Sequence, residues 1–69
     1  MINLTKLNGQ TFTLNAIYIE EIQSFPDTTI TLTNGHKFLV KESEKEVVRL
    51  VTDYFKLINL LGTDKKMEG

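Results

Sequence analysis

The residues best suited to acid–base or metal chemistry are the single histidine, His36, and the adjacent carboxylates Glu20 and Glu21. His36 has no cysteine, second histidine or G-x-S-x-G serine beside it, and a metal site needs at least two further ligands at suitable spacing. Glu20 and Glu21 are neighbours on an expected strand, where successive side chains point to opposite faces, so they are not placed to flank one bond. We therefore expect an exposed His36 at a strand start, solvated glutamates, and neither a catalytic nor a metal site.

The glycines and lysines do not form a phosphate-binding pattern. None of the four glycines belongs to a G-x-x-x-x-G-K or G-x-G-x-x-G loop, so no nucleotide site is indicated. A basic stripe could be assembled from lysines, but each lysine has a carboxylate nearby, which is typical of a solvated surface. The lysines are Lys37, Lys41, Lys45 and Lys56, and the carboxylates are Glu42, Glu44, Glu46 and Asp53. We expect no cofactor and no enzymatic activity.

Tyr18 and Phe25 are the aromatic residues that an apolar strand face needs least. They could stack with the bases of single-stranded nucleic acid on a small barrel. The charge is against this, because 8 Lys and Arg and 9 Asp and Glu give a net charge of −1, and no basic field attracts a polyanion. We expect Tyr18 and Phe25 to serve the core or a protein interface, and no nucleic-acid partner.

Length and composition limit the chain to one small domain. It has 69 residues, of which 41% are hydrophobic, and no cysteine, so a disulfide framework and a thiolate metal site are both excluded. Apolar runs such as Phe38-Leu39-Val40 are far shorter than the roughly 20 residues that span a bilayer, and Met1-Ile2-Asn3 has no basic region typical of a signal peptide. The expectation is a cytoplasmic protein with no transmembrane segment.

Alternation of polar and apolar residues around Asn8-Gly9, and again around Asn34-Gly35, predicts two β-hairpins. A two-residue loop would put apolar residues on both faces of a hairpin, because opposite residues share a face. A three-residue loop, with the glycine left-handed in a bulge, makes one face apolar. The pairs then predicted are Leu4 with Phe12, Ile2 with Leu14, Ile30 with Phe38, and Thr28 with Val40.

The segment between the hairpins predicts a short turn followed by a strand. Asn15 is suited to cap a single helical turn, and residues 20–25 look extended. Ile19 and Ile22 are three residues apart, so a regular strand would point them to opposite faces. Placing both on the apolar face requires an irregularity in this strand. Pro26-Asp27 then fits a tight turn. About five short strands result.

The segment after residue 41 predicts a helix. Ser43-Glu44-Lys45-Glu46 has the form of a capping box, in which Ser43 bonds the Glu46 amide and the Glu46 side chain bonds back. Apolar residues recur at helical spacing as far as Leu61, and Gly62 is placed to end the helix as a left-handed residue. The expected domain therefore covers residues 1–62, with a flexible tail over 63–69. The fold class is α+β: a small antiparallel meander or partly open β-barrel of about five strands, followed by one C-terminal amphipathic helix.

The apolar positions of this helix fill an arc of about 180°, whereas docking on a sheet needs about 100°. A sheet that covers the middle of the arc leaves two flanks, unless it curls enough to cover both. We expect the flanks, with Tyr18 and Phe25, to bind a partner or a second copy, because a chain of this size buries only about 60% of its unfolded surface. Self-association would use the helix and one exposed strand edge. The flank residues are Val48 and Phe55 on one side and Leu50, Leu57 and Leu61, extended by Leu60, on the other.

Four blocks occur in order along the chain: Leu4-Thr5-Lys6-Leu7-Asn8-Gly9, Leu14-Asn15-Ala16 with Ile19-Glu20-Glu21-Ile22, Pro26-Asp27-Thr28-Thr29-Ile30-Thr31-Leu32-Thr33-Asn34-Gly35, and Val40-Lys41-Glu42-Ser43. Together they resemble the short FlbD-type flagellar proteins, also called the SwrD swarming motility family. The resemblance covers about residues 1 to 60. Its motifs coincide with turns, caps and core faces, so they indicate a fold and name no binding site.

The resemblance implies a small, non-enzymatic cytoplasmic protein that is encoded among flagellar genes and is needed for full motor power or swarming. Its expected partner is a flagellar motor or basal-body protein of unknown identity, which would place it at the cytoplasmic face of the basal body. A small β-domain regulator that binds nucleic acid is the alternative. The order of hairpin, Pro-Asp turn and Asn-Gly turn resembles the DNA-binding β-domains of response regulators, although the net charge of −1 is against it.

Overall fold

Within residues 1–68, five short strands precede one long helix, and a 3₁₀ helix follows the second strand. The computed structural model describes the backbone of residues 1–68 and the side chains of residues 1–60. The elements are β1 (Ile2–Thr5), β2 (Thr11–Leu14), η1 (Ala16–Tyr18), β3 (Ile19–Gln23), β4 (Thr28–Leu32), β5 (Lys37–Val40) and α1 (Glu44–Glu68).

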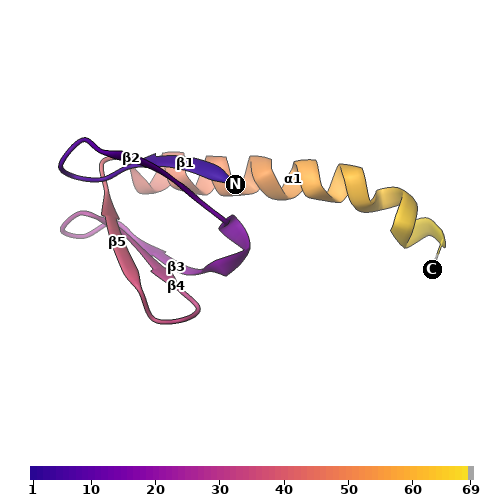
Figure 1. Ribbon diagram of the computed structural model, residues 1–69, viewed down its shortest axis with the longest axis horizontal. Helices are drawn as coiled ribbons and strands as arrows, with labels where there is room; N and C mark the ends of the chain where they lie inside the picture. Colours follow the sequence, from indigo (N-terminus) through magenta and orange to yellow (C-terminus); the bar gives the residue numbers. More distant parts are fainter. Residues whose placement is uncertain (69) are drawn as a thin grey trace.

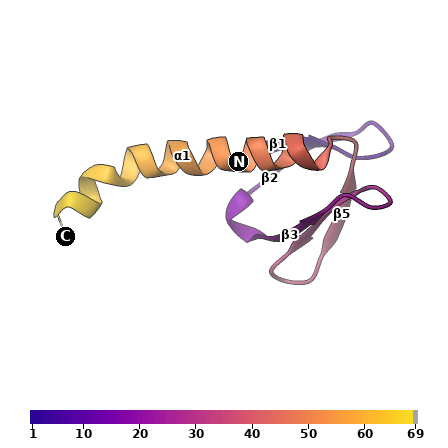
Figure 2. The ribbon, with the colours of Figure 1, turned by 180° about the vertical axis from the view of Figure 1, so that it is seen from behind.

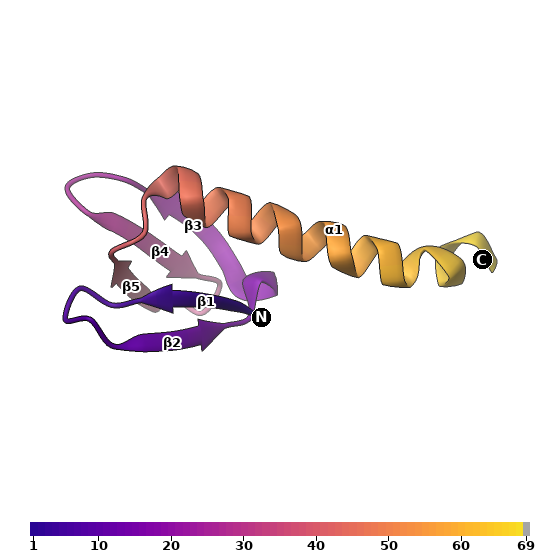
Figure 3. The ribbon, with the colours of Figure 1, turned by 90° about the horizontal axis from the view of Figure 1, so that it is seen from above.

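The strands form two antiparallel sheets, β1-β2 and β3-β4-β5, which meet where β1 ends beside β5. There Lys6 bridges to Val40, and the Thr5 carbonyl accepts a hydrogen bond from the Lys41 amide at 2.8 Å. The strands thus follow the order β2-β1-β5-β4-β3 in an arrangement that is not closed, and α1 packs against β1 and β3 (Figures 1 and 3). The predicted α+β fold, a partly open meander followed by a helix, is confirmed.

Both hairpins have the predicted register. Leu4 faces Phe12 and Ile2 faces Leu14 in the first, while Ile30 faces Phe38 and Thr28 faces Val40 in the second. Gly9 and Gly35 lie at φ of 93° and 91°, in the left-handed region that glycine enters without steric cost. The requirement for one apolar face therefore selected the correct loop in each hairpin.

The connection between the hairpins also follows its prediction. The Asn15 side chain accepts a hydrogen bond from the Ile17 amide at 3.1 Å and caps η1. The register of β3 against β4 shifts between Ile19 and Glu21, which is the irregularity that the apolar phase required. Past this shift, Ile22 faces Ile30 and joins the apolar side.

The core lies between the two sheets and the first half of α1. Its buried side chains come from β1, η1, β4, β5 and α1, and partly buried side chains of β2 and β3 pack against them. The rings of Phe12 and Phe38, one from each hairpin, approach to 5.3 Å between centroids and close one end of the core. The buried apolar residues are Ile2, Leu4, Ala16, Ile30, Leu32, Val40 and Val47.

α1 begins as predicted but ends later. The Ser43 hydroxyl accepts a hydrogen bond from the Glu46 amide at 3.1 Å, so Ser43 is the N-cap; between these two described residues the reciprocal bond of a full capping box is not formed. The helix continues through Gly62 to Glu68, so the prediction that Gly62 ends it is wrong. A glycine inside a helix costs only about 1 kcal/mol relative to alanine, and residues 65–68 favour helix. The flexible tail over 63–69 stays a prediction.

No helix in the described part of the chain combines the length and the apolar character that crossing a membrane requires.

Candidate interaction surface

α1 is longer than the sheets that it covers, and this leaves apolar side chains in solvent. Its 25 residues span about 37 Å, whereas strands of four or five residues span about 13–17 Å. The C-terminal half of α1 therefore projects past the sheets (Figure 2), and the molecule is 45 Å long but only 21 Å and 18 Å across. Leu57 is 54% exposed and Leu60 is 73% exposed.

The exposed apolar residues of α1 lie on two flanks. Val48 and Phe55, seven residues apart, share one flank, and Leu57 and Leu60 lie on the other. All four are exposed, so the sheets do not curl far enough to cover either flank completely. The structure thus brings these four predicted residues to an accessible surface, and their role in binding stays a prediction.

Leu50 and Leu61 stand apart from this set. Leu50 was expected on an uncovered flank, but it is half-buried and packs against the core cluster. Its exposure was wrongly predicted because the N-terminal half of α1 lies close over β1, where the sheet reaches further round the helix. The side chain of Leu61 lies outside the described residues.

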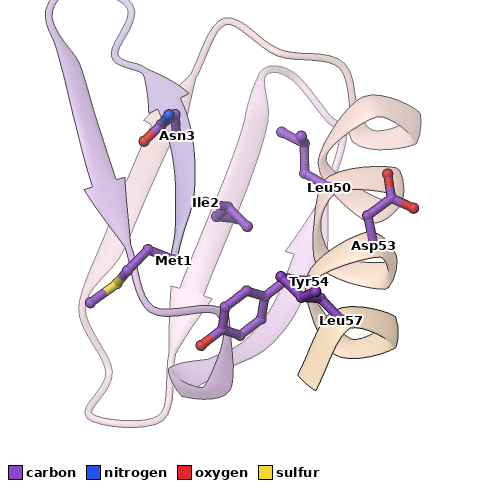
Figure 4. Close-up of a pocket in the computed structure, with 7 residues that line it drawn as sticks. All are labelled: Met1, Ile2, Asn3, Leu50, Asp53, Tyr54 and Leu57. Carbon is purple, nitrogen blue, oxygen red and sulfur yellow. The ribbon is translucent and has the colours of Figure 1, made fainter. Parts of the chain in front are cut away.

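A shallow groove of about 310 Å³ runs between the start of β1 and α1 (Figure 4). Leu50 and Tyr54 point from α1 toward the strand and form one wall, while Asp53 points away from it. The other wall comes from the first three residues of the chain. The lining residues are Met1, Ile2, Asn3, Leu50, Asp53, Tyr54 and Leu57. Leu57 thus belongs both to the groove and to an exposed flank, which makes the two surfaces continuous.

Two polar contacts lie along the helix side of this groove. The Tyr54 hydroxyl donates a hydrogen bond to Asn15 Oδ1 at 3.4 Å, which ties α1 to the cap of η1. Asp53 pairs with Arg49 one helical turn away at 3.4 Å, with both side chains largely in solvent. An exposed pair of this kind contributes little to stability. Asp53 therefore marks a polar rim beside an apolar floor.

The structure does not bring Tyr18 and Phe25 together. Tyr18 ends η1 and Phe25 follows β3, so the length of β3, about 17 Å, lies between them. Phe25 is 88% exposed on the turn from β3 to β4, and Tyr18 is also exposed. Neither serves the core, which leaves a protein interface as the prediction for both.

The one carboxylate with a clearly shifted pKa among the described residues is Glu42. Its oxygens accept hydrogen bonds from the Thr5 amide at 2.9 Å and the Thr5 hydroxyl at 2.8 Å. Burial raises the pKa of Glu42, but these bonds from Thr5 outweigh it and bring the pKa below its ordinary value. Glu42 acts as a structural link between the end of β1 and the start of the helix.

The residues first considered for catalysis do not form a site. His36 is exposed directly before β5, as predicted. Its backbone amide donates to Asn34 Oδ1 at 3.0 Å, and its carbonyl accepts from the Leu32 amide at 2.8 Å. Glu20 and Glu21 are both exposed, and Glu21 accepts a bond from the Gln23 side chain. Within the described residues, no three histidine, aspartate or glutamate side chains gather as metal ligands do.

Two features of the surface were missed from the sequence. The groove needs Met1 beside Leu57, and the Glu42 link joins Thr5 to a residue 37 positions later. Periodicity within single elements does not report either pairing, because both depend on how β1 sits against α1 and β5. A partial indication was present, since the apolar arc of the helix was wider than a sheet can cover.

Comparison with known proteins places the chain in a family. The family model of the FlbD flagellar and swarming motility proteins matches residues 1–59. This match spans both hairpins and the part of α1 that carries Val48, Phe55 and Leu57. No curated protein and no solved structure shows significant similarity to the chain. With 59 of its 69 residues matched, the chain belongs to the FlbD family of flagellar and swarming motility proteins.

Proposed function

We propose that this protein is a non-enzymatic cytoplasmic accessory of the flagellar motor, acting at the cytoplasmic face of the basal body as SwrD-type proteins are expected to act. It supports swarming and motor power by binding another flagellar protein. Membership of the FlbD family supports the motility role. The binding role and the location go beyond what family membership shows.

The observation that carries the binding role is the uncovered second flank of α1. Leu57 and Leu60 are 54% and 73% exposed, and Leu57 continues into the groove beside Met1. Transfer of a leucine side chain out of water stabilises a complex by about 1.5–3 kcal/mol when it is buried completely. An apolar strip on a projecting helix, with Asp53 at its rim, is therefore suited to a partner surface that is apolar at its centre.

The titratable groups support a non-enzymatic role. Glu42 has both carboxylate oxygens engaged by Thr5, and its shifted pKa is explained by that link rather than by a reactive site. Self-association is also part of the proposal, because a chain of 69 residues gains by burying surface against a second copy.

The test is a charge substitution on the flank in motile cells. Leu57→Glu with Leu60→Glu should reduce swarming to the level of a strain that lacks the gene, because the loss of about 3 kcal/mol of apolar burial weakens binding by about 100-fold. Thr52→Glu with Lys56→Gln is the matched control, since it also changes the net charge by −2, on the exposed polar side of the same helix. Protein abundance and the circular dichroism of the purified variants establish that both fold.

Three readouts decide the outcome. Normal swarming and motor torque in the flank variant, at normal abundance, would refute the binding role of α1. A photo-crosslinker at Leu57 should capture a flagellar protein that the same crosslinker at Thr52 does not. A shift of labelled DNA or RNA by the purified protein, weakening steeply with salt, would instead favour the alternative of a nucleic-acid-binding regulator.

A further inference from the structure

β2 is one of the two outermost strands, and its free side is open. Its only strand partner in the described residues is β1, and in Figure 3 no other element lies beyond it. A shallow hollow of about 500 Å³, lined by Asn3, Thr11, Phe12 and Thr13, lies over the outer face of the β1-β2 hairpin. There is space at this edge for another strand.

The hydrogen bonds of Thr5 identify which backbone groups face that space. The Thr5 amide donates to Glu42 and the Thr5 carbonyl accepts from Lys41, so both groups point away from β2. Thr5 faces Thr11 in the register, which makes this a non-hydrogen-bonded pair, and the pattern repeats every two residues. Thr11 and Thr13 therefore direct their N–H and C=O groups outward, which gives four unpaired backbone groups on this edge.

β2 itself lacks the features with which proteins prevent strands from pairing, and the charge nearest to Phe12 is that of Lys6, whose Nζ lies 5.7 Å from the centroid of the Phe12 ring. Residues 7–19 contain no charged side chain, although at 25% charged residues about three would be expected in 13 positions. β2 has no proline, lysine or bulge. The opposite outer strand is protected, since β3 carries Glu20 and Glu21, has a register shift and packs against α1. The difference singles out β2 as the pairing edge.

We propose that β2 pairs antiparallel with β2 of a second copy of this chain about a two-fold axis. Thr11 of each copy then faces Thr13 of the other, which uses all four outward backbone groups. Phe12 lies on the axis and faces its own copy in a non-hydrogen-bonded pair, where side chains approach most closely. The two hairpins join into one four-stranded sheet. This assigns the self-association proposed above to β2 and leaves the flanks of α1 to the flagellar partner.

A second copy fits the edge because of its chemistry. Antiparallel self-pairing brings each side chain near its own equivalent, so any charge on β2 would be set against a like charge, and β2 has none. Thr and Phe are residues that strands favour, and the Phe12 ring already packs on Phe38 at 5.3 Å, which holds it in place for the contact. A four-residue strand buries less than a standard interface, so the dimer is weak and its formation depends on concentration.

Sedimentation equilibrium and amide chemical shifts of the full chain, followed up to about 1 mM, test the pairing. The wild type should associate, with the largest shift changes at the Thr11 and Thr13 amides. Thr13→Pro removes an outward N–H that the monomer does not use, and Thr13→Lys adds a charge at the edge. Each should weaken association by more than about tenfold. Thr13→Val, which keeps an uncharged β-branched side chain, is the matched control and should associate as the wild type does.

The outcomes separate this pairing from the rest of the proposal. A wild type that is monomeric throughout the concentration range overturns both the self-association and the β2 assignment. Association that survives Thr13→Lys and Thr13→Pro but is lost in the Leu57→Glu, Leu60→Glu variant overturns the β2 assignment alone. Far-ultraviolet circular dichroism at low concentration checks that the Thr13 variants are folded, and Thr13→Lys keeps the test valid if Thr13→Pro is not.

Discussion

Replacing Glu42 by glutamine should destabilise the domain by about 1.5 kcal/mol, because Glu42 links β1 to the start of α1 through both of its oxygens. Glutamine can accept from the Thr5 amide through its one oxygen, and its NH₂ group can donate to the Thr5 hydroxyl, which accepts as well as donates. Both hydrogen bonds then change from charge-assisted to neutral. Such bonds contribute about 1.5–3 and about 0.5–1.5 kcal/mol respectively, and the partial exposure of Glu42 to solvent reduces the difference.

The pH dependence of this effect has a defined sign. The pKa of Glu42 in the folded protein lies below its ordinary value of 4.5, so the carboxylate stabilises the fold fully above that value. The contribution is lost as the pH falls through the folded-state pKa, where the carboxyl group is protonated and resembles glutamine. The difference in the free energy of unfolding between wild type and Glu42→Gln should therefore be constant near neutral pH and disappear in acid.

Urea unfolding followed by circular dichroism at a series of pH values measures this difference. In thermal unfolding at neutral pH, the melting temperature of the variant should lie about 6–12 °C below that of the wild type, as expected for about 1.5 kcal/mol in a domain of this size. Glu20→Gln, at an exposed carboxylate, is the control and should change the free energy of unfolding by less than about 0.5 kcal/mol. Equal stability of the Glu42→Gln variant and the wild type at neutral pH, or a difference that persists in strong acid, would refute the reasoning.

Two further predictions concern the turns and the histidine. Gly9→Val and Gly35→Val should each lower the free energy of unfolding by about 1–3 kcal/mol in urea titrations, since φ near +90° is strained for a β-branched residue although no atom lies within 4 Å of the added Cβ. Gly9→Asn should cost less, and an equal loss for asparagine and valine would contradict this explanation. His36→Ala should leave both swarming and the melting temperature unchanged because the side chain is exposed, and loss of swarming at normal abundance would reopen a metal or catalytic role.

Local features of the fold were predictable because each follows from a constraint within a few residues. The requirement that Leu4 and Phe12 share a face determined the loop, the register and the sign of φ at Gly9 together. Ser43 and Asn15 were recognisable as caps because a cap is defined by its own side chain and the next turn.

Features that depend on packing between elements were not predictable from the pattern. Gly62 is a different case, a local one: glycine often ends a helix, but the residues after it favour helix, and α1 continues to Glu68. Leu50 has the helical angle of a flank residue, yet it is covered because the helix sits asymmetrically over β1. The candidate surface was predicted as a set of residues, whereas its division into a groove beside Met1 and two flanks needed the structure.

The joint between the two hairpins has a consequence for the order in which the chain folds. Each hairpin closes on a three-residue loop, so its contacts span short sequence separations and are inexpensive in chain entropy. The joint between the hairpins is narrow. It consists of the bridge between Lys6 and Val40 and the hydrogen bonds of Thr5, which join it to Glu42, 37 residues later in the chain. We expect such a contact to form after the transition state, once both hairpins exist. Substitutions at this joint should then accelerate unfolding and leave the folding rate almost unchanged, so that the joint sets the kinetic lifetime of the native state rather than the speed of folding.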